Sequence, residues 1–196
     1  MNEEKAEDDQ WAGWFEVQRK AVNHSINGSL RAAIEEVNGY LRMTSIRDIR
    51  RRAVGFRGDL WEESGDLAAA KIDFMAAHEL SEDADYERYT LELALGCLNK
   101  KQKANSEAIS WYLKALETAN ANPGISGVEA LAEYVKLLDQ EKPVQTERDL
   151  MWRVARKAWT LLKLEGAPNL DDLAATLKIL KMPKGGESGN STAPRR

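Results

Sequence analysis

Residues that could perform chemistry are few in this chain, and they are scattered. The two histidines, His24 and His78, each lack a companion at metal-ligand spacing. The single cysteine, Cys97, follows a glycine at a helix-packing position and has no histidine near it in sequence, so we expect an inert thiol. No glycine-rich loop of the phosphate-binding kind is present. We therefore expect no enzyme: no catalytic residue, no metal site and no cofactor.

An arginine-rich stretch is the strongest concentration of one charge. Residues 47–57 read RDIRRRAVGFR and contain Arg47, Arg50, Arg51, Arg52 and Arg57. On a helix, Arg50 and Arg57 lie two turns apart on nearly one line, where they could hold acidic side chains or phosphates. The alternative is a solvated helix face that acidic neighbours balance. A nucleic-acid site would normally add stacking aromatic residues or further basic helices.

Composition limits the compartment and the partners. The 196 residues carry a formal net charge of −4, too small to draw the chain to DNA or to an anionic membrane. No apolar run approaches the length of a membrane span. The first ten residues are acidic, unlike a secretory signal, and one cysteine cannot form an internal disulfide. We expect a cytoplasmic protein with no membrane partner.

Apolar residues three and four apart predict a series of helices, separated by breaks at glycine, asparagine and proline. Ser29, Asp66 and a Ser45–Asp48 capping box are the expected N-caps. The pattern divides the chain into an acidic flexible N-terminus (1–9), a helical repeat domain (10–181) and a disordered tail (182–196). About nine helices are expected, over residues 10–25, 30–41, 45–61, 67–77, 81–100, 105–116, 127–140, 146–164 and 170–180.

Internal repetition is the strongest signal in the sequence. A shift of 37 residues places Gly28-Ser29-Leu30 over Gly65-Asp66-Leu67, and a further 38 residues bring a third unit. A small residue where two helices cross lets their backbones approach, and a large residue fills the space beside it. Positions that align in this way are Ala21, Gly58 and Gly96 in the first helices, and Val37, Phe74 and Tyr112 in the second helices.

These units resemble tetratricopeptide repeats. The best match is Arg51–Leu80, in which Gly58 and Trp61 are followed by the Gly65-Asp66 turn. The resemblance covers about residues 14–165 and implies an all-α, right-handed α-solenoid of three to four antiparallel helix pairs, with a C-terminal capping helix. The period of 37 to 38 exceeds the family's usual 34 or so, and the repeat-ending proline is absent. An unrelated helical bundle is the alternative.

In such a solenoid the first helix of each pair lines the concave face. The resemblance assigns to that face Phe15, Gln18, Arg19 and Val22; Arg52, Phe56, Asp59 and Glu63; Thr90, Leu93, Ala94, Cys97 and Lys101; and Val128, Leu131, Val135 and Leu138. Repeats that grip the carboxylate end of chaperone peptides need Lys, Asn and Arg on three successive concave helices, and that set is missing here. The groove is open to a partner, or the C-terminal helix fills it.

The sequence therefore predicts a protein-interaction module: an adaptor, a regulator, an effector chaperone or a toxin-neutralising partner. Its partner would be another protein, offering an apolar or acidic helix or peptide, and a second copy of the chain is also a candidate. The alternative is a nucleic-acid-associated regulator that uses the Arg47–Arg57 helix, against which the overall acidity argues. The predicted contact residues are Phe15, Arg50, Arg52, Phe56, Arg57, Leu93, Lys101 and Leu131.

Overall fold

The computed structural model describes residues 3–82, 85–137 and 145–165, and within these ranges it contains eight α-helices and no strand. The chain is thus all-α, as predicted. The expected helix at 170–180 and the expected tail lie outside the described residues. The helices are α1 (Glu3–Ile26), α2 (Leu30–Leu41), α3 (Arg47–Ser64), α4 (Leu67–Leu80), α5 (Tyr86–Lys101), α6 (Asn105–Ala121), α7 (Val128–Leu137) and α8 (Gln145–Glu165).

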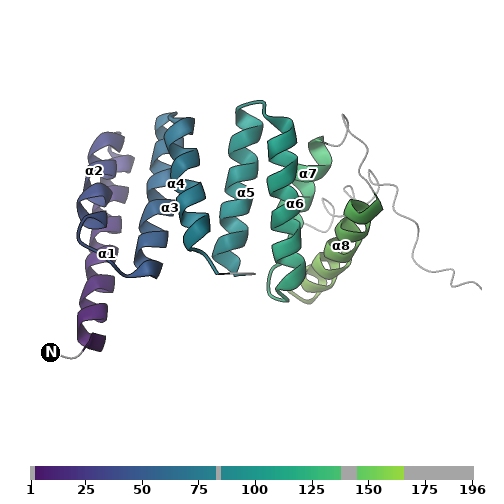
Figure 1. Ribbon diagram of the computed structural model, residues 1–196, viewed down its shortest axis with the longest axis horizontal. Helices are drawn as coiled ribbons and strands as arrows, with labels where there is room; N and C mark the ends of the chain where they lie inside the picture. The colour runs from purple at the N-terminus through teal and green to yellow at the C-terminus, as the bar shows by residue number, and fades with distance from the viewer. Residues whose placement is uncertain (1–2, 83–84, 138–144, 166–196) are drawn as a thin grey trace, which may run out of the picture.

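The helices pack in sequence order and form a helical solenoid. The helices within each of the pairs α1–α2, α3–α4, α5–α6 and α7–α8 contact each other, and α2–α3, α4–α5 and α6–α7 contacts join one pair to the next. Figure 1 shows the result as a row of helices that stand side by side from the N-terminal end to α8, which is inclined to the others. The first helices of neighbouring pairs also touch, α1 with α3 and α5 with α7.

Small and aromatic residues meet where the helices of a pair cross. A Cβ atom added at Gly58 would lie 2.7 Å from the ring of Phe74, and one added at Gly96 would lie 2.4 Å from the ring of Tyr112. Both rings are buried, so each glycine creates the space that an aromatic side chain of the second helix fills. The predicted small-and-aromatic pattern is therefore the packing rule of two successive helix pairs.

The same turn ends the first helix of three pairs. Gly28, Gly65 and Lys103 have φ angles of 75°, 86° and 60°, in the left-handed region, and they recur at intervals of 37 and 38 residues. After each of them a backbone N–H reaches back to a carbonyl of the preceding helix, for example Asp66 N–H to Trp61 O at 3.0 Å. The repeat period predicted from the sequence is thus also the interval at which the left-handed turn recurs in the backbone.

Helix starts are less regular than the sequence predicted. Asp66 caps α4, because its side chain accepts a hydrogen bond from Ala69 N–H at 2.9 Å. The Ser45–Asp48 capping box is wrong: α3 begins after Ile46, with no side-chain cap, and Ser29 gives α2 none either. The first helix begins at Glu3 and so runs through the acidic segment that was expected to be flexible.

None of the described helices combines the length and the low polarity that a bilayer span requires.

Candidate functional site

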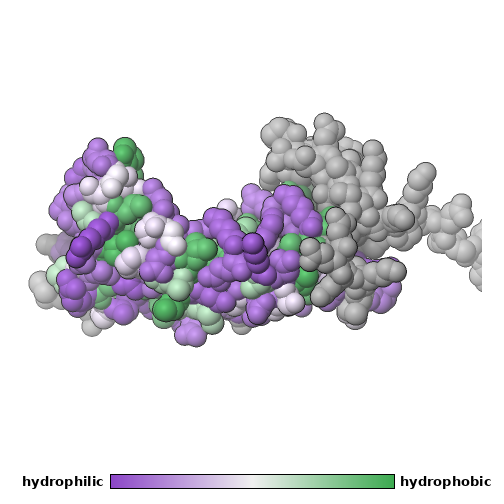
Figure 2. Space-filling model, turned by 90° about the horizontal axis from the view of Figure 1, so that it is seen from above, coloured by the Kyte–Doolittle hydropathy of each residue, from purple (hydrophilic) through white to green (hydrophobic). Residues whose placement is uncertain are grey.

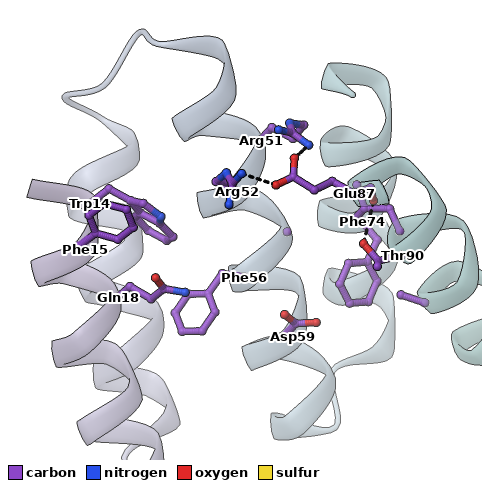
Figure 3. Close-up of a pocket in the computed structure, with 13 residues that line it drawn as sticks. Trp14, Phe15, Gln18, Arg51, Arg52, Phe56, Asp59, Phe74, Glu87 and Thr90 are labelled. Atoms are coloured by element: carbon purple, nitrogen blue, oxygen red, sulfur yellow. Dashed lines mark hydrogen bonds and ion pairs between the residues drawn. The ribbon is translucent and has the colours of Figure 1, made fainter. Parts of the chain in front are cut away.

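A hollow opens on the face formed by α1, α3 and α5. It has a volume of about 320 Å³. Figure 2 shows the molecule hollowed on one side, with hydrophobic side chains gathered among polar ones toward the N-terminal helices. Figure 3 shows the hollow from within. Its lining residues are Trp14, Phe15, Gln18, Arg51, Arg52, Gly55, Phe56, Asp59, Phe74, Glu87, Thr90, Leu91 and Ala94.

Helical periodicity places these residues on one side of each helix. On α3 the residues Arg52, Phe56 and Asp59 follow one another at intervals of four and three, so they form one stripe. The lining residues of α1 and α5 have the same spacing, and the contact between α1 and α3 brings two of the stripes together. Of the residues assigned to the concave face on these three helices, the following line the hollow: Phe15, Gln18, Arg52, Phe56, Asp59, Thr90 and Ala94.

Aromatic rings form the α1 side of the hollow. Trp14 is buried, and the Phe56 ring meets it edge-on with ring centroids 5.9 Å apart. Phe15 is 58% exposed, although it stacks in a tilted arrangement with Trp11 at 6.0 Å. An exposed phenylalanine beside buried rings leaves apolar surface that a partner side chain can cover.

Charged side chains at one end of the hollow neutralise each other. Arg51 is buried and forms ion pairs with Glu87, with Asp85 at 3.6 Å and with Asp48 at 3.8 Å. Arg52 also reaches Glu87, at 2.5 Å (Figure 3). Its guanidinium lies 5.6 Å from the centre of the Trp11 ring. These two arginines are therefore already provided with acidic and aromatic partners from the chain itself.

Asp59 differs from the other charged residues of the hollow. Its side chain remains exposed to solvent, but protein atoms surround it on several sides. This partial loss of water raises the pKa of Asp59 to about 6, and the nearby charge of Glu62 adds to the effect. In Figure 3 the carboxyl group lies apart from the arginines and is joined to no other residue drawn.

Of the predicted contact residues, three line the hollow: Phe15, Arg52 and Phe56. Lys101 does not line the hollow. Its side chain is exposed at the C-terminal end of α5 and forms an ion pair with Glu62 at 2.5 Å. Leu93 is half-buried and packs against the core formed by α5 to α8.

Leu131 was predicted as a groove contact, and this prediction is corrected. Its side chain is fully buried in the core formed by α5 to α8, together with Val135. The helix α7 packs against both α6 and α8, and these neighbours cover the apolar face that was assigned to the groove. The described residues of that face, Val128, Leu131 and Val135, therefore belong to the core or pack against it.

Arg50 and Arg57 were predicted to contact a partner, but both bind within the fold. Arg50 Nη1 donates hydrogen bonds to the carbonyl oxygen of Leu41, the last residue of α2, at 3.0 Å, and to that of Thr44, just after α2, at 2.9 Å. Arg57 forms two hydrogen bonds of 2.7 Å with Asp73 and a third with Asn38. Each arginine thus ties α3 to a neighbouring helix.

The arginine-rich stretch consequently presents no single basic face. Arg47 donates a hydrogen bond to the carbonyl oxygen of Leu80, at the end of α4, at 3.1 Å. Its side chain therefore has a different partner from those of Arg50 and Arg57. Because a helix turns about 100° per residue, five arginines within eleven residues point to several neighbours. Arg50 and Arg57 do lie two turns apart on α3, as predicted, but their guanidinium groups are hydrogen-bonded to other parts of the chain.

The candidates for chemistry also have structural roles. His78 Nε2 lies 3.0 Å from the buried carboxylate of Glu92. Cys97 is half-buried and accepts a hydrogen bond from the Tyr112 hydroxyl at 3.5 Å. Among the described residues, no group of three or more histidine, cysteine or acidic side chains could hold a metal ion.

Several lining residues were missed by the sequence reading: Trp14, Arg51, Gly55, Glu87, Leu91 and, from α4, Phe74. Leu91 and Glu87 lie one turn and two turns before Ala94 on one stripe of α5, so following the i, i+3/i+4 spacing back from Ala94 would have found them. Phe74 reaches the hollow from a second helix, through the gap beside the glycines of α3, and no pattern in one helix indicates that.

The fold is similar to that of a solved protein. No protein-family model matches the sequence, and no curated protein matches it. The crystal structure of BtubC (BKLC) from P. vanneervenii matches with a TM-score of 0.58. The match covers 96% of this chain and 93% of that chain, at 14% sequence identity. At this identity the likeness concerns the fold alone, and function has to be argued from the hollow.

Proposed function

We propose that this protein is an interaction module that holds a helix or an extended peptide of another protein in the hollow between α1, α3 and α5. The observation that carries the proposal is the combination of a preformed hollow with an exposed aromatic residue, Phe15, next to the rings of Trp14 and Phe56. Grooves lined by rigid helices bind peptides at a low entropic cost, because the site does not have to order itself on binding.

The distribution of polar groups supports binding in preference to catalysis. The charged residues of the hollow are two arginines paired with one glutamate, and a single aspartate. The described part of the hollow contains no histidine and no cysteine. This set provides a charged rim around an apolar centre, the usual arrangement of a protein-binding surface.

We also propose that the helix pairs are tetratricopeptide-like. Their support is the recurrence of three features at 37 to 38 residues: the small residue of the first helix, the aromatic or aliphatic residue that covers it, and the left-handed turn. The family's concave face is a frequent site of peptide binding, which agrees with the function proposed above. A cytoplasmic location remains part of the proposal.

A nucleic-acid partner is the second candidate, and no described contact favours it. The arginines that suggested it donate to backbone carbonyls or pair with acidic residues of neighbouring helices. A mobility-shift assay at low and moderate salt tests it directly, because phosphate contacts weaken steeply as salt rises.

Photo-crosslinking in the producing cell tests the proposed function. A benzophenone amino acid replaces Phe15 in one variant and Ile72 in another; Ile72 is 69% exposed on α4 and lies outside the hollow. We expect a discrete protein adduct from position 15 and none from position 72. Equal adducts at both positions, or none at position 15, would contradict the proposal.

A further inference from the structure

The two carboxylates of the hollow have different surroundings. Glu87 forms ion pairs with both Arg51 and Arg52. Asp59, on the same face of α3 two turns beyond Arg52, has neither an ion pair nor a hydrogen bond among the described residues. The end of the hollow near Asp59 therefore contains a negative charge that the fold leaves uncompensated.

Cations on the helices that line the hollow have partners other than Asp59. On α1, Arg19 pairs with Glu16 at 2.7 Å. On α5, Lys101 pairs with Glu62 at 2.5 Å. Arg57 of α3 is held by Asp73, which is nearly buried. Among the described residues, the lining helices thus supply no ion pair to Asp59, and the nearby Glu62, itself paired with Lys101, carries a charge of the same sign.

The surroundings of Asp59 suit a long cationic side chain. Phe56 lies one turn before Asp59 and offers a half-buried ring, while the Phe74 ring of α4 is buried beneath the hollow against Gly58. Gly55 and Ala94 line the hollow with small residues, on α3 and α5. The methylene groups of a lysine or arginine can pack on such rings while the charged end reaches a carboxylate, and the ring faces themselves attract cations.

We propose that the hollow receives a lysine or arginine side chain of the partner segment, next to an apolar residue that covers Phe15, and that Asp59 is the counter-ion. This inference rests on the proposed function and specifies the chemistry of its partner. Of the apolar or acidic partner that the sequence predicted, it keeps the apolar contact and replaces the acidic one by a basic one, because the arginines of the hollow are paired with acidic residues and Asp59, among the described residues, is not paired.

The ionisation of Asp59 agrees with this arrangement. Its pKa is raised to about 6 because the hollow removes water from the carboxylate, and Glu62 adds to the effect. A cation placed beside the carboxylate restores the lost interactions. Binding of a cation there would therefore favour the ionised form of Asp59.

Selection from a random peptide library displayed on phage tests the inference with the full-length chain. The wild-type protein and the Asp59→Asn variant are used as parallel targets. We expect the wild type to enrich peptides with lysine or arginine beside an apolar residue, and Asp59→Asn to lose that preference. The dissociation constant of a selected lysine peptide should rise about tenfold on Asp59→Asn, a typical coupling for a close charge pair.

A second peptide isolates the charge contribution. The selected lysine is replaced by norleucine, and its dissociation constant should change less than twofold between the wild type and Asp59→Asn. Enriched acidic peptides, or an equal affinity of the lysine peptide for both proteins, would overturn the inference.

The remaining outcomes separate this inference from the proposed function. Peptides that need Phe15 but not Asp59 would overturn the cation site and keep the binding hollow. If the wild type selects no peptide, both proposals are overturned. A dimer in sedimentation velocity that Phe15→Glu dissociates would assign the hollow to a second copy of the chain and overturn the peptide proposal.

Discussion

The Phe74 ring covers Gly58 so closely that a Cβ atom on the glycine would lie 2.7 Å from two ring carbons. The same relationship holds between Gly96 and Tyr112 in the next pair, at 2.4 Å. The helices of these two pairs, α3–α4 and α5–α6, are therefore held at a separation that only glycine allows. The separation matters for the hollow, because Phe74 packs under α3 and also lines that cavity.

We expect Gly58→Ala to lower the free energy of unfolding by about 1 to 2 kcal/mol, because the new methyl group overlaps the Phe74 ring and forces the helices apart. Gly55→Ala is the matched control on the same helix. Its Cβ would meet Ala77 and Leu91 at an ordinary 3.7 Å, so helix propensity should leave the protein unchanged or more stable by up to about 1 kcal/mol. Urea denaturation measures both. Equal effects of the two substitutions would contradict the packing argument.

The left-handed turns give a second prediction. Gly65→Ala should lower the free energy of unfolding by about 1 kcal/mol, because its φ of 86° is costly for a residue with a side chain. Lys103 occupies the equivalent position with φ 60°, and Lys103→Gly should raise stability by about 0.5 kcal/mol. Thermal denaturation of the two variants checks this. If Lys103→Gly destabilises the protein, the third turn is not equivalent to the second.

The sequence predicted the parts of the fold that depend on local spacing. Small residues at the helix crossings and apolar residues recur with the period of the helix pairs, and so the turn at Gly65-Asp66 and the crossing at Gly58 could both be located. Helix starts were harder, since Ile46 precedes α3 without a side-chain cap.

The site could be predicted only in part. Phe15, Phe56 and Arg52 were assigned to the concave face through the resemblance to tetratricopeptide repeats, and all three line the hollow. The engagement of Arg57 by Asp73 depends on a helix that follows later in the chain, so sequence spacing does not indicate it. The burial of Leu131 depends in the same way on α6 and α8.

Two arginines of α3 should differ sharply in their effect on stability. Arg57→Ala leaves the Asp73 carboxylate, which is 6% exposed, without its partner, and we expect a loss of about 3 kcal/mol. Arg52→Ala removes an ion pair from a side chain that is 50% exposed, and the loss should stay below about 1 kcal/mol. Chemical denaturation at one pH and one salt concentration compares them. Similar losses would contradict the structural role assigned to Arg57.

Asp59 should make stability depend on pH. The pKa of its carboxyl is raised to about 6 in the folded chain from an ordinary value of 3.8, so the folded state favours the protonated form. The stabilising effect of the protonated group is fully present below pH 3.8 and is lost as pH rises through 6.

Asp59→Asn should therefore be more stable than the wild type at pH 7.5, by about 0.5 to 1 kcal/mol, since solvent screens part of the charge. The difference should vanish near pH 3.8 or below. Denaturation at pH 3.5, 5 and 7.5 measures it. A wild type that is more stable than Asp59→Asn at pH 7.5 would show that the carboxylate has a favourable partner.

The central claim is that the hollow between α1, α3 and α5 binds a partner protein. Its most direct test is the dissociation constant of the crosslinked partner for three proteins: the wild type, Phe15→Glu and Ile72→Glu. Both substituted side chains are exposed, 58% and 69%, so both variants should fold. We predict that Phe15→Glu weakens binding at least tenfold, while Ile72→Glu changes it less than twofold. Unchanged binding by Phe15→Glu, or an equal loss in both variants, would contradict the claim.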